Sequence, residues 1–265
     1  MVSRKESKTE SGSATTGYLI LSGLTVVLLT LFYKDATYLV FAIPLVLVFT
    51  LAASADKKGG GVDEDLEAVG WSDKGMELAV PLGIIGGMVV LFLGSIMTRY
   101  TPDTASILVP DFSSIAALTT ATVIPPYLSL SVNILSQWLV VSTSEESLAR
   151  VLAPFAFMKI FKNTIIAFIL AGFFWMLMHI PTYIAQGANQ SMYLVLLLLA
   201  FINTVLYIWT GNLISSIIAH ATFNSGVLLS ANNFDTGTMY VVLIIAAILI
   251  YAWLSGALKS GKVKV

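Results

Sequence analysis

The sequence predicts an all-α, polytopic integral membrane protein, built as a bundle of about eight transmembrane helices. Hydrophobic residues make up 57% of the 265 residues and charged residues only 11%, whereas a soluble domain carries about 25% charged residues. Apolar segments long enough to cross roughly 30 Å of hydrocarbon recur along the chain. The chain has no cysteine, which excludes disulfides and a cysteine nucleophile. Its net charge of −1 gives no field that would recruit nucleic acid.

The predicted organisation begins with a polar, disordered tail over residues 1–16, followed by N-terminal transmembrane helices over 17–112. The polar loop 56–77 within that region is too short to form a second domain. The first apolar segment is followed by no clear cleavage site, so we expect it to be retained as a span. The region 113–258 forms the helical core, and a basic tail covers 259–265. Lys and Arg in the first tail and in the 56–77 loop favour a cytoplasmic N-terminus.

The apolar segments that predict helices are 18–33, 36–55, 78–97, 127–143, 151–160, 164–184, 191–210, 213–230 and 238–256. The number of spans is open between residues 113 and 161. Pro125, Pro126 and Pro154 interrupt the apolar pattern there, so the segment is one long kinked helix or two shorter ones. The connection over residues 99–112 is predicted to be a loop.

Charged residues are rare in the predicted core. Between residues 112 and 234 they are Glu145, Glu146, Arg150, Lys159 and Lys162. An ionisable group at membrane depth costs roughly 2.5–3.5 kcal/mol, so three in one short stretch need a reason. Glu146 and Arg150 are four residues apart and can pair on one helix face. Glu145 lies about 100° round the helix, without a nearby cation in sequence, which suits a general acid or base. The two lysines are expected in a solvated turn.

Both histidines of the chain, His179 and His220, fall in the same region. His179 follows an aromatic-rich stretch in which Trp175 precedes it by four residues. His220 and Asn224 are also four residues apart and share a helix face. Two helical hairpins between Glu145 and His220 would return all these side chains to one depth. The sequence therefore predicts a single polar cluster inside an apolar bundle.

These segments resemble the CPBP family, the type II CAAX prenyl proteases and their bacteriocin-processing relatives. The family pattern is EExxxR, then FxxxH, then HxxxN or HxxxD, on separate transmembrane helices. The matching residues are, in order, Glu145, Glu146, Arg150, His179, His220 and Asn224. Two positions depart from the pattern: Trp175 stands where phenylalanine is usual, and Val151 follows the arginine where glycine is common. Because an aromatic ring is kept, we expect the packing role of Trp175 to survive.

The resemblance implies an intramembrane endopeptidase that hydrolyses a peptide bond with a glutamate-activated water. It implies that Glu145 is the general base and that His179 positions or polarises the water. It further implies that His220 and Asn224 donate hydrogen bonds to the oxyanion of the tetrahedral intermediate. The residues expected to support the site are Glu146, Arg150 and Trp175.

The implied partners are the lipid bilayer and a peptide or lipidated protein substrate, without nucleic acid. No cofactor is favoured, although two Glu and two His could ligate Zn²⁺ in a metalloendopeptidase-like variant. Two other functions stay open on the sequence alone. One is a non-catalytic membrane scaffold, immunity factor or complex subunit on the same fold. The other is a proton-coupled transporter with Glu145, Glu146 and His179 as a relay, which the clustering of polar residues at one level disfavours.

Overall fold

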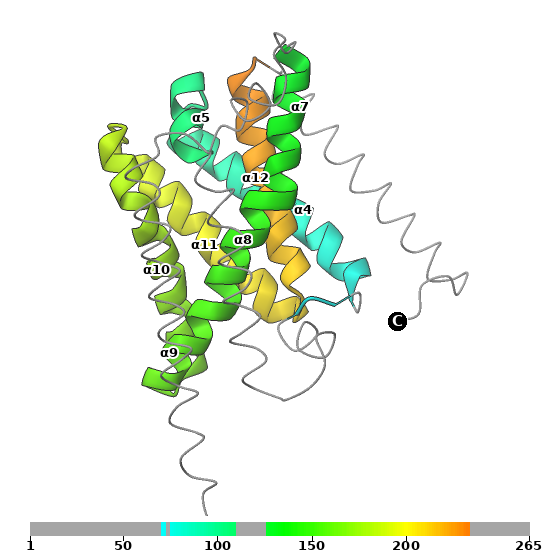
Figure 1. Ribbon diagram of the computed structural model, residues 1–265, viewed down its shortest axis with the longest axis vertical. Coiled ribbons are helices and arrows are strands. Elements are labelled where there is room, and N and C mark those ends of the chain that lie inside the picture. The colour runs from blue at the N-terminus through cyan, green and yellow to red at the C-terminus, as the bar shows by residue number, and fades with distance from the viewer. Residues whose placement is uncertain (1–69, 73–74, 110–125, 234–265) are drawn as a thin grey trace, which may run out of the picture.

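The computed structural model describes residues 70–72, 75–109 and 126–233, and every regular element in these ranges is a helix (Figure 1). The elements are α4 (Met76–Met97), α5 (Pro102–Leu108), α7 (Pro126–Ser136), η1 (Gln137–Val141), α8 (Ser142–Glu146), η2 (Ser147–Leu152), α9 (Ala153–Phe161), α10 (Thr164–Ala185), α11 (Gln190–Thr210) and α12 (Leu213–Ala231), with η denoting a π-helix. The predicted all-α fold is confirmed for this part of the chain. The predicted helices 18–33, 36–55 and 238–256, and with them the count of eight, lie outside the described residues.

Four of the described helices are long and apolar enough to cross a bilayer. They cover Met76–Met97, Thr164–Pro181, Gln190–Thr210 and Leu213–Ala231. Each agrees with a segment predicted from hydropathy to within a few residues. The protein is therefore an integral membrane protein. The predicted cytoplasmic position of the N-terminus lies outside the described residues.

The segment that the sequence left as one helix or two is a single helical run over residues 126–161. Figure 1 shows α7, α8 and α9 as one continuous ribbon. Pro126 begins the run, where its missing N–H is no loss. The π-helical segments η1 and η2 flank α8. In a π-helix the backbone hydrogen bonds join residues five apart, whereas in an α-helix they join residues four apart. Pro154 follows in the first turn of α9, where a proline is tolerated. Lys162, with a φ of 53°, ends α9, and both Lys159 and Lys162 are exposed there.

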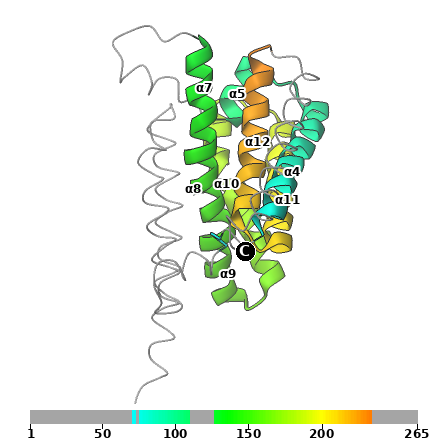
Figure 2. The same cartoon turned by 90° about the vertical axis from the view of Figure 1, so that its right-hand side faces the viewer.

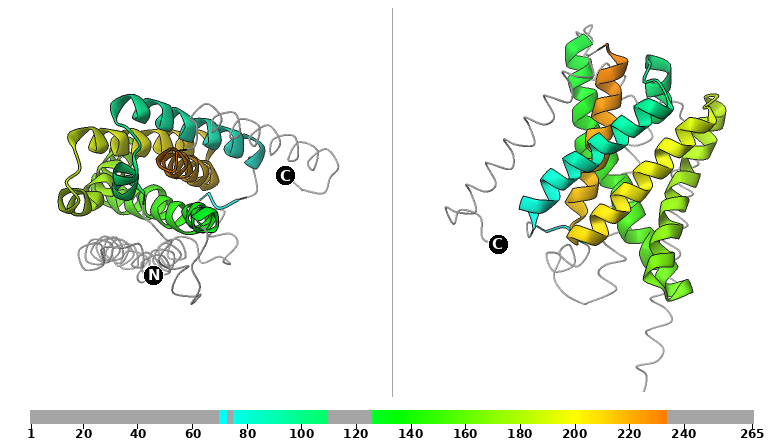
Figure 3. Two further views of the ribbon diagram at one scale, coloured as in Figure 1. Left: turned by 90° about the horizontal axis from the view of Figure 1, so that it is seen from above. Right: turned by 180° about the vertical axis from the view of Figure 1, so that it is seen from behind.

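Helix α12 is the central element. Seen from above, it lies between α4 and the 126–161 run (Figure 3, left), and the side view gives the same order (Figure 2). Of its membrane-spanning stretch 78% is buried, against 28–44% for the other three spans. The Ser, Thr, Asn and His side chains of α12 therefore face protein rather than lipid, which is what polar groups at membrane depth require.

Two glycines allow α4 to cross α12 backbone against backbone. A Cβ atom on Gly87 would lie 2.4 Å from the carbonyl oxygen of Ala219, and one on Gly83 would lie 2.6 Å from that of Ser215. No other residue fits at these distances, and small residues at helix crossings serve the same purpose in membrane proteins generally. This crossing fixes the position of α12 within the bundle.

The predicted loop over residues 99–112 is wrong in part, because it contains the short helix α5. Thr101 begins this helix as a capping box, in which the side chains of Thr101 and Thr104 each receive the other's backbone N–H. Pro102 occupies the first turn. This Thr-Pro-x-Thr pattern is a start signal for a helix. The hydropathy pattern hid it because α5 is too short to register as a span.

Candidate active site

Four residues that the sequence singled out line one small cavity in the bundle. Glu145 comes from α8, His179 from α10, and His220 and Asn224 from α12. The other lining residues are Leu108, Val141, Trp175, Leu196 and Leu199. The cavity volume is about 10 Å³, which is roughly the space that one water molecule needs. The structure thus brings together at one place three motifs that are far apart in the chain.

Glu145 has two partners from α10. Its Oε2 accepts a hydrogen bond of 2.9 Å from the indole Nε1 of Trp175. The Nε2 atom of His179 lies 3.4 Å from the same oxygen. The Trp175 side chain is fully buried, as its expected packing role requires, but it is also a hydrogen-bond donor to the carboxylate. Phenylalanine, which is usual at this position in the CPBP pattern, has no such donor.

The ring of His179 is oriented by the backbone of its own helix. Its Nδ1 lies 2.8 Å from the carbonyl oxygen of Trp175. A carbonyl can only accept, so Nδ1 carries the hydrogen, and in the neutral ring Nε2 is then an acceptor. Two acceptors, this Nε2 and Oε2 of Glu145, face each other. A proton shared by the two atoms, or a water that donates a hydrogen bond to each, satisfies both acceptors.

Glu146 is fully buried and lies at the centre of a second polar cluster, which shares His220 with the cavity. Its Oε1 accepts hydrogen bonds from His220 Nδ1 at 2.8 Å and Asn203 Nδ2 at 2.9 Å. Its Oε2 accepts one from Arg150 Nε at 2.8 Å, so the predicted Glu146–Arg150 pair is present. Arg150 also donates from Nη1 to Thr204 Oγ1 at 2.7 Å. Glu146 is not among the residues that line the cavity; it lies behind His220 and holds that ring.

The sequence reasoning missed Asn203 and Thr204. They form the one Asn-Thr pair inside the otherwise apolar span of α11, and that interruption is the signal that could have found them. A polar pair at membrane depth needs partners within the protein. Here the partners are the carboxylate and the guanidinium of the buried cluster.

Asn224 reaches from α12 to the 126–161 run. Its Nδ2 donates to Oε1 of Gln137 at 3.0 Å. Its Oδ1 is buried and has no hydrogen-bond partner among the residues that the structure describes. An amide nitrogen has two hydrogens, and the bond to Gln137 uses one of them. Gln137 carried no signal in the sequence, because nothing in a single chain marks it as a partner of Asn224.

The side chains of the described residues are not arranged as a zinc site. In the described part of the chain no group of three or more His, Asp or Glu side chains is arranged to hold a metal ion. The Nδ1 atoms of His179 and His220 are engaged by a carbonyl and by Glu146. Glu146, one of the two glutamates considered as zinc ligands, accepts hydrogen bonds from Arg150, Asn203 and His220 instead.

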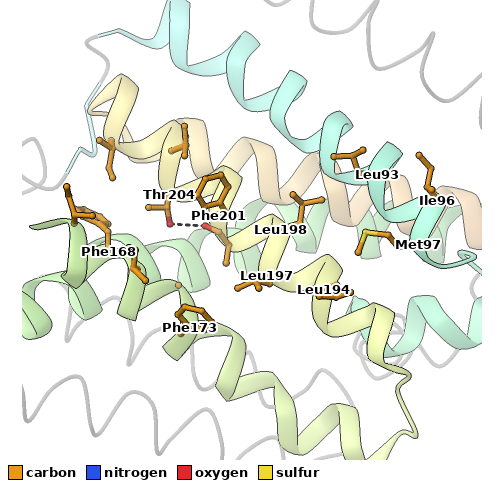
Figure 4. Close-up of a pocket in the computed structure, with 16 residues that line it drawn as sticks. Leu93, Ile96, Met97, Phe168, Phe173, Leu194, Leu197, Leu198, Phe201 and Thr204 are labelled. Atoms are coloured by element: carbon orange, nitrogen blue, oxygen red, sulfur yellow. Dashed lines mark hydrogen bonds between the residues drawn. The ribbon is translucent and has the colours of Figure 1, made fainter.

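A second, much larger space lies between α4, α10 and α11 (Figure 4). This groove has a volume of about 860 Å³, and Thr204 alone among the described residues lining it has a polar side chain. That hydroxyl donates to the Ala200 carbonyl at 2.8 Å, and Figure 4 draws a dashed line at Thr204. Leu196 and Leu199 on α11 line the small cavity, whereas Leu197 and Phe201 line the groove. The small cavity and the groove are therefore two spaces that contact different residues of α11.

A family model matches part of the chain. Residues 127–226 match the family model described as type II CAAX prenyl endopeptidase Rce1-like. No curated protein and no solved structure matches the chain. The matched region begins in α7 and ends in α12, so it contains every motif residue of the cavity and of the buried cluster. Over residues 127–226 the chain is thus similar to the type II CAAX prenyl endopeptidase Rce1-like family.

Proposed function

We propose that the protein is an intramembrane endopeptidase that hydrolyses a peptide bond with a water activated by Glu145. The observation that supports this most directly is the cavity. It has room for about one water molecule and is lined by a carboxylate, two imidazoles and a carboxamide. Hydrolysis of an amide needs a base for the water and donors for the oxyanion. These residue types supply both.

In the proposed reaction, Glu145 takes a proton from the water as the oxygen attacks the carbonyl carbon of the substrate. The tetrahedral intermediate then collapses, the C–N bond breaks, and the proton passes to the nitrogen of the leaving amine. Trp175 and His179 hold the Oε2 side of the carboxylate, which leaves Oε1 as the oxygen that faces the water. His179 can pass the proton onward because its Nε2 lies beside Glu145.

The oxyanion would be stabilised from α12. Asn224 contributes the amide N–H that Gln137 does not use. His220 contributes Nε2–H when its ring is protonated, and Glu146, which accepts from Nδ1, compensates that charge. A carboxylate that orients a histidine and stabilises the imidazolium has the same role in serine hydrolases. In a bundle with low dielectric such donors count for more than in water.

Substrate access requires movement, because a cavity of about 10 Å³ cannot hold a peptide. Leu108 on α5 and the two leucines of α11 fill the space beside the polar groups. Peptide bonds inside a transmembrane helix are shielded by their own hydrogen bonds. We therefore propose that the substrate presents an unwound or C-terminal segment, as a CAAX-type substrate does.

The test uses the purified protein in lipid nanodiscs with two fluorogenic peptides. One ends in a farnesylated cysteine, two aliphatic residues and a serine, and the other is its unprenylated twin. Glu145→Gln should lower the turnover number by about a hundredfold or more at an unchanged melting temperature, because glutamine keeps an acceptor for Trp175. Lys159→Gln, at an exposed site, is the matched control and should cleave normally. If wild type and Glu145→Gln behave alike, the proposal fails, and a non-catalytic scaffold becomes the better account.

A further inference from the structure

Three carboxamides form a hydrogen-bonded row that leads from the 126–161 run into the cavity. Gln137 Nε2 donates to Asn133 Oδ1 at 3.2 Å, and Gln137 Oε1 accepts from Asn224 Nδ2 at 3.0 Å. Gln137 is fully buried and Asn133 and Asn224 are nearly so. Only Asn224 lines the cavity. Neither Asn133 nor Gln137 belongs to the motifs that mark the site in the sequence.

The row has a direction, because each carboxamide has a donor end and an acceptor end. If Gln137 alone turned over, its NH₂ would face the NH₂ of Asn224 and its oxygen would face the oxygen of Asn133. If Asn224 alone turned over, two oxygens would meet. Buried polar atoms that face like atoms lose their hydrogen bonds at full desolvation cost. The orientation of Asn224 is therefore tied to that of Gln137, and through it to that of Asn133.

We propose that Gln137 is a positioning residue for the reaction: it fixes the carboxamide of Asn224 so that a defined N–H faces the cavity. The inference rests on the proposed function and adds to it a residue from outside the motifs. A donor to the oxyanion acts only if it is preorganised. Asn224 by itself could rotate about its side chain and present oxygen instead, which would repel the oxyanion. Gln137 prevents that rotation by accepting the other N–H.

The neighbouring residue provides a matched control. Trp138 Nε1 donates to Ser225 Oγ at 2.9 Å, so consecutive residues of η1 contact consecutive residues of α12. Figure 2 shows this helical run beside α12. Trp138 does not line the cavity. Its hydrogen bond therefore joins the same two helices as that of Gln137 without touching a residue of the site. A variant at Trp138 reports what a loss of helix attachment does by itself.

The experiment measures kcat and KM for the farnesylated fluorogenic peptide in nanodiscs, together with melting temperatures. Gln137→Met, which keeps the length of the side chain but cannot accept from Asn224, should lower kcat by at least about tenfold with little change in KM. Trp138→Phe should keep kcat within about twofold. In an Asn224→Ala background, Gln137→Met should have no further effect on kcat, because it acts through Asn224.

Wild-type kcat in Gln137→Met, or effects of Gln137→Met and Asn224→Ala that multiply, would overturn the inference. If Gln137→Met does not fold, Asn133→Ala decides the question: it removes the Asn133 oxygen to which Gln137 Nε2 donates, and kcat should fall by about threefold or more, whereas unchanged kcat overturns the inference. Glu145→Gln, assayed in parallel, distinguishes failure of the proposed function from failure of the inference about Gln137. If it cleaves as well as wild type, the proposed function fails and the inference with it. If Glu145→Gln is inactive while Gln137→Met has the kcat of the wild type, the inference about Gln137 fails and the proposed function stands.

Discussion

The indole N–H of Trp175 donates to Oε2 of Glu145 over 2.9 Å, from the helix that also carries His179. Trp175 contacts the polar groups of the site in two further ways. The centroid of its ring lies 4.5 Å from the ring centroid of His179. It lies 5.6 Å from the ring centroid of His220, in an edge-to-face arrangement. One buried aromatic side chain thus contacts three of the four motif residues that line the cavity, and packing alone does not describe its role.

Replacing Trp175 with phenylalanine should separate the hydrogen bond from the packing. Hydrogen bonds to a charged group contribute about 1.5–3 kcal/mol, so the turnover number should fall at least about tenfold. The melting temperature should change less than in Trp175→Ala, which also removes a fully buried ring at a cost of about 3–5 kcal/mol. Turnover measured per folded protein in nanodiscs tests this. Normal turnover in Trp175→Phe would show that Glu145 needs no donor from the indole.

Glu146→Gln should destabilise the protein by about 3–5 kcal/mol, because it leaves Arg150 buried without a counter-charge. The glutamine NH₂ would also face donors, since both carboxylate oxygens accept hydrogen bonds. Thermal melting in detergent measures the loss. Because Glu146 also holds the ring of His220, the turnover number of the folded protein should fall as well. A Glu146→Gln protein of normal stability and turnover would refute the supporting role of Glu146.

Gly87→Ala should push α4 away from α12, because its Cβ would lie 2.4 Å from a backbone oxygen that cannot move alone. We expect a loss of about 1–3 kcal/mol in unfolding free energy. Gly172→Ala is the matched control, since its Cβ would meet only the Ala200 Cβ at 3.8 Å. That variant should be neutral or stabilising by up to about 1 kcal/mol through helix propensity. Equal melting temperatures for the two variants would mean that the α4–α12 crossing is not tightly packed.

Chelators should leave peptide cleavage unchanged. The described residues offer no group of three metal-binding side chains, and a structural or catalytic zinc site needs at least three protein ligands. The measurement is the initial cleavage rate after dialysis against EDTA and after addition of 1,10-phenanthroline. A rate that falls and is restored by added Zn²⁺ would replace the metal-free mechanism.

Hydropathy and motif spacing predicted the helices and the residues that meet in the cavity, because both depend on local patterns. The apolar runs gave α4, α10, α11 and α12, and the i,i+4 spacing gave the Glu146–Arg150 pair. Those signals are carried by the chain itself. A bilayer also requires the apolar segments to be helical, because backbone groups without hydrogen-bond partners are excluded from hydrocarbon.

The remaining parts of the site depend on how the helices are rotated against one another, which one sequence does not reveal. Gln137 lies in the π-helical segment η1 and bonds to Asn224 on α12, and Asn203 on α11 bonds to Glu146 on the 126–161 run. A π-helical turn has no reliable residue signature. For the same reason the second role of Trp175, as a donor to Glu145, was not foreseeable from an aromatic position in a motif.

The Glu146–Arg150 bond has a consequence for biogenesis. Both residues lie in one continuous helical run, so they can pair as soon as that helix forms. Asn203, Thr204 and His220, which complete the cluster, are on helices that leave the ribosome later. An unpaired charge at mid-membrane costs roughly 2.5–3.5 kcal/mol during translocon-guided insertion. Their contact within one helix lets these two residues neutralise each other's charge before α11 and α12 arrive.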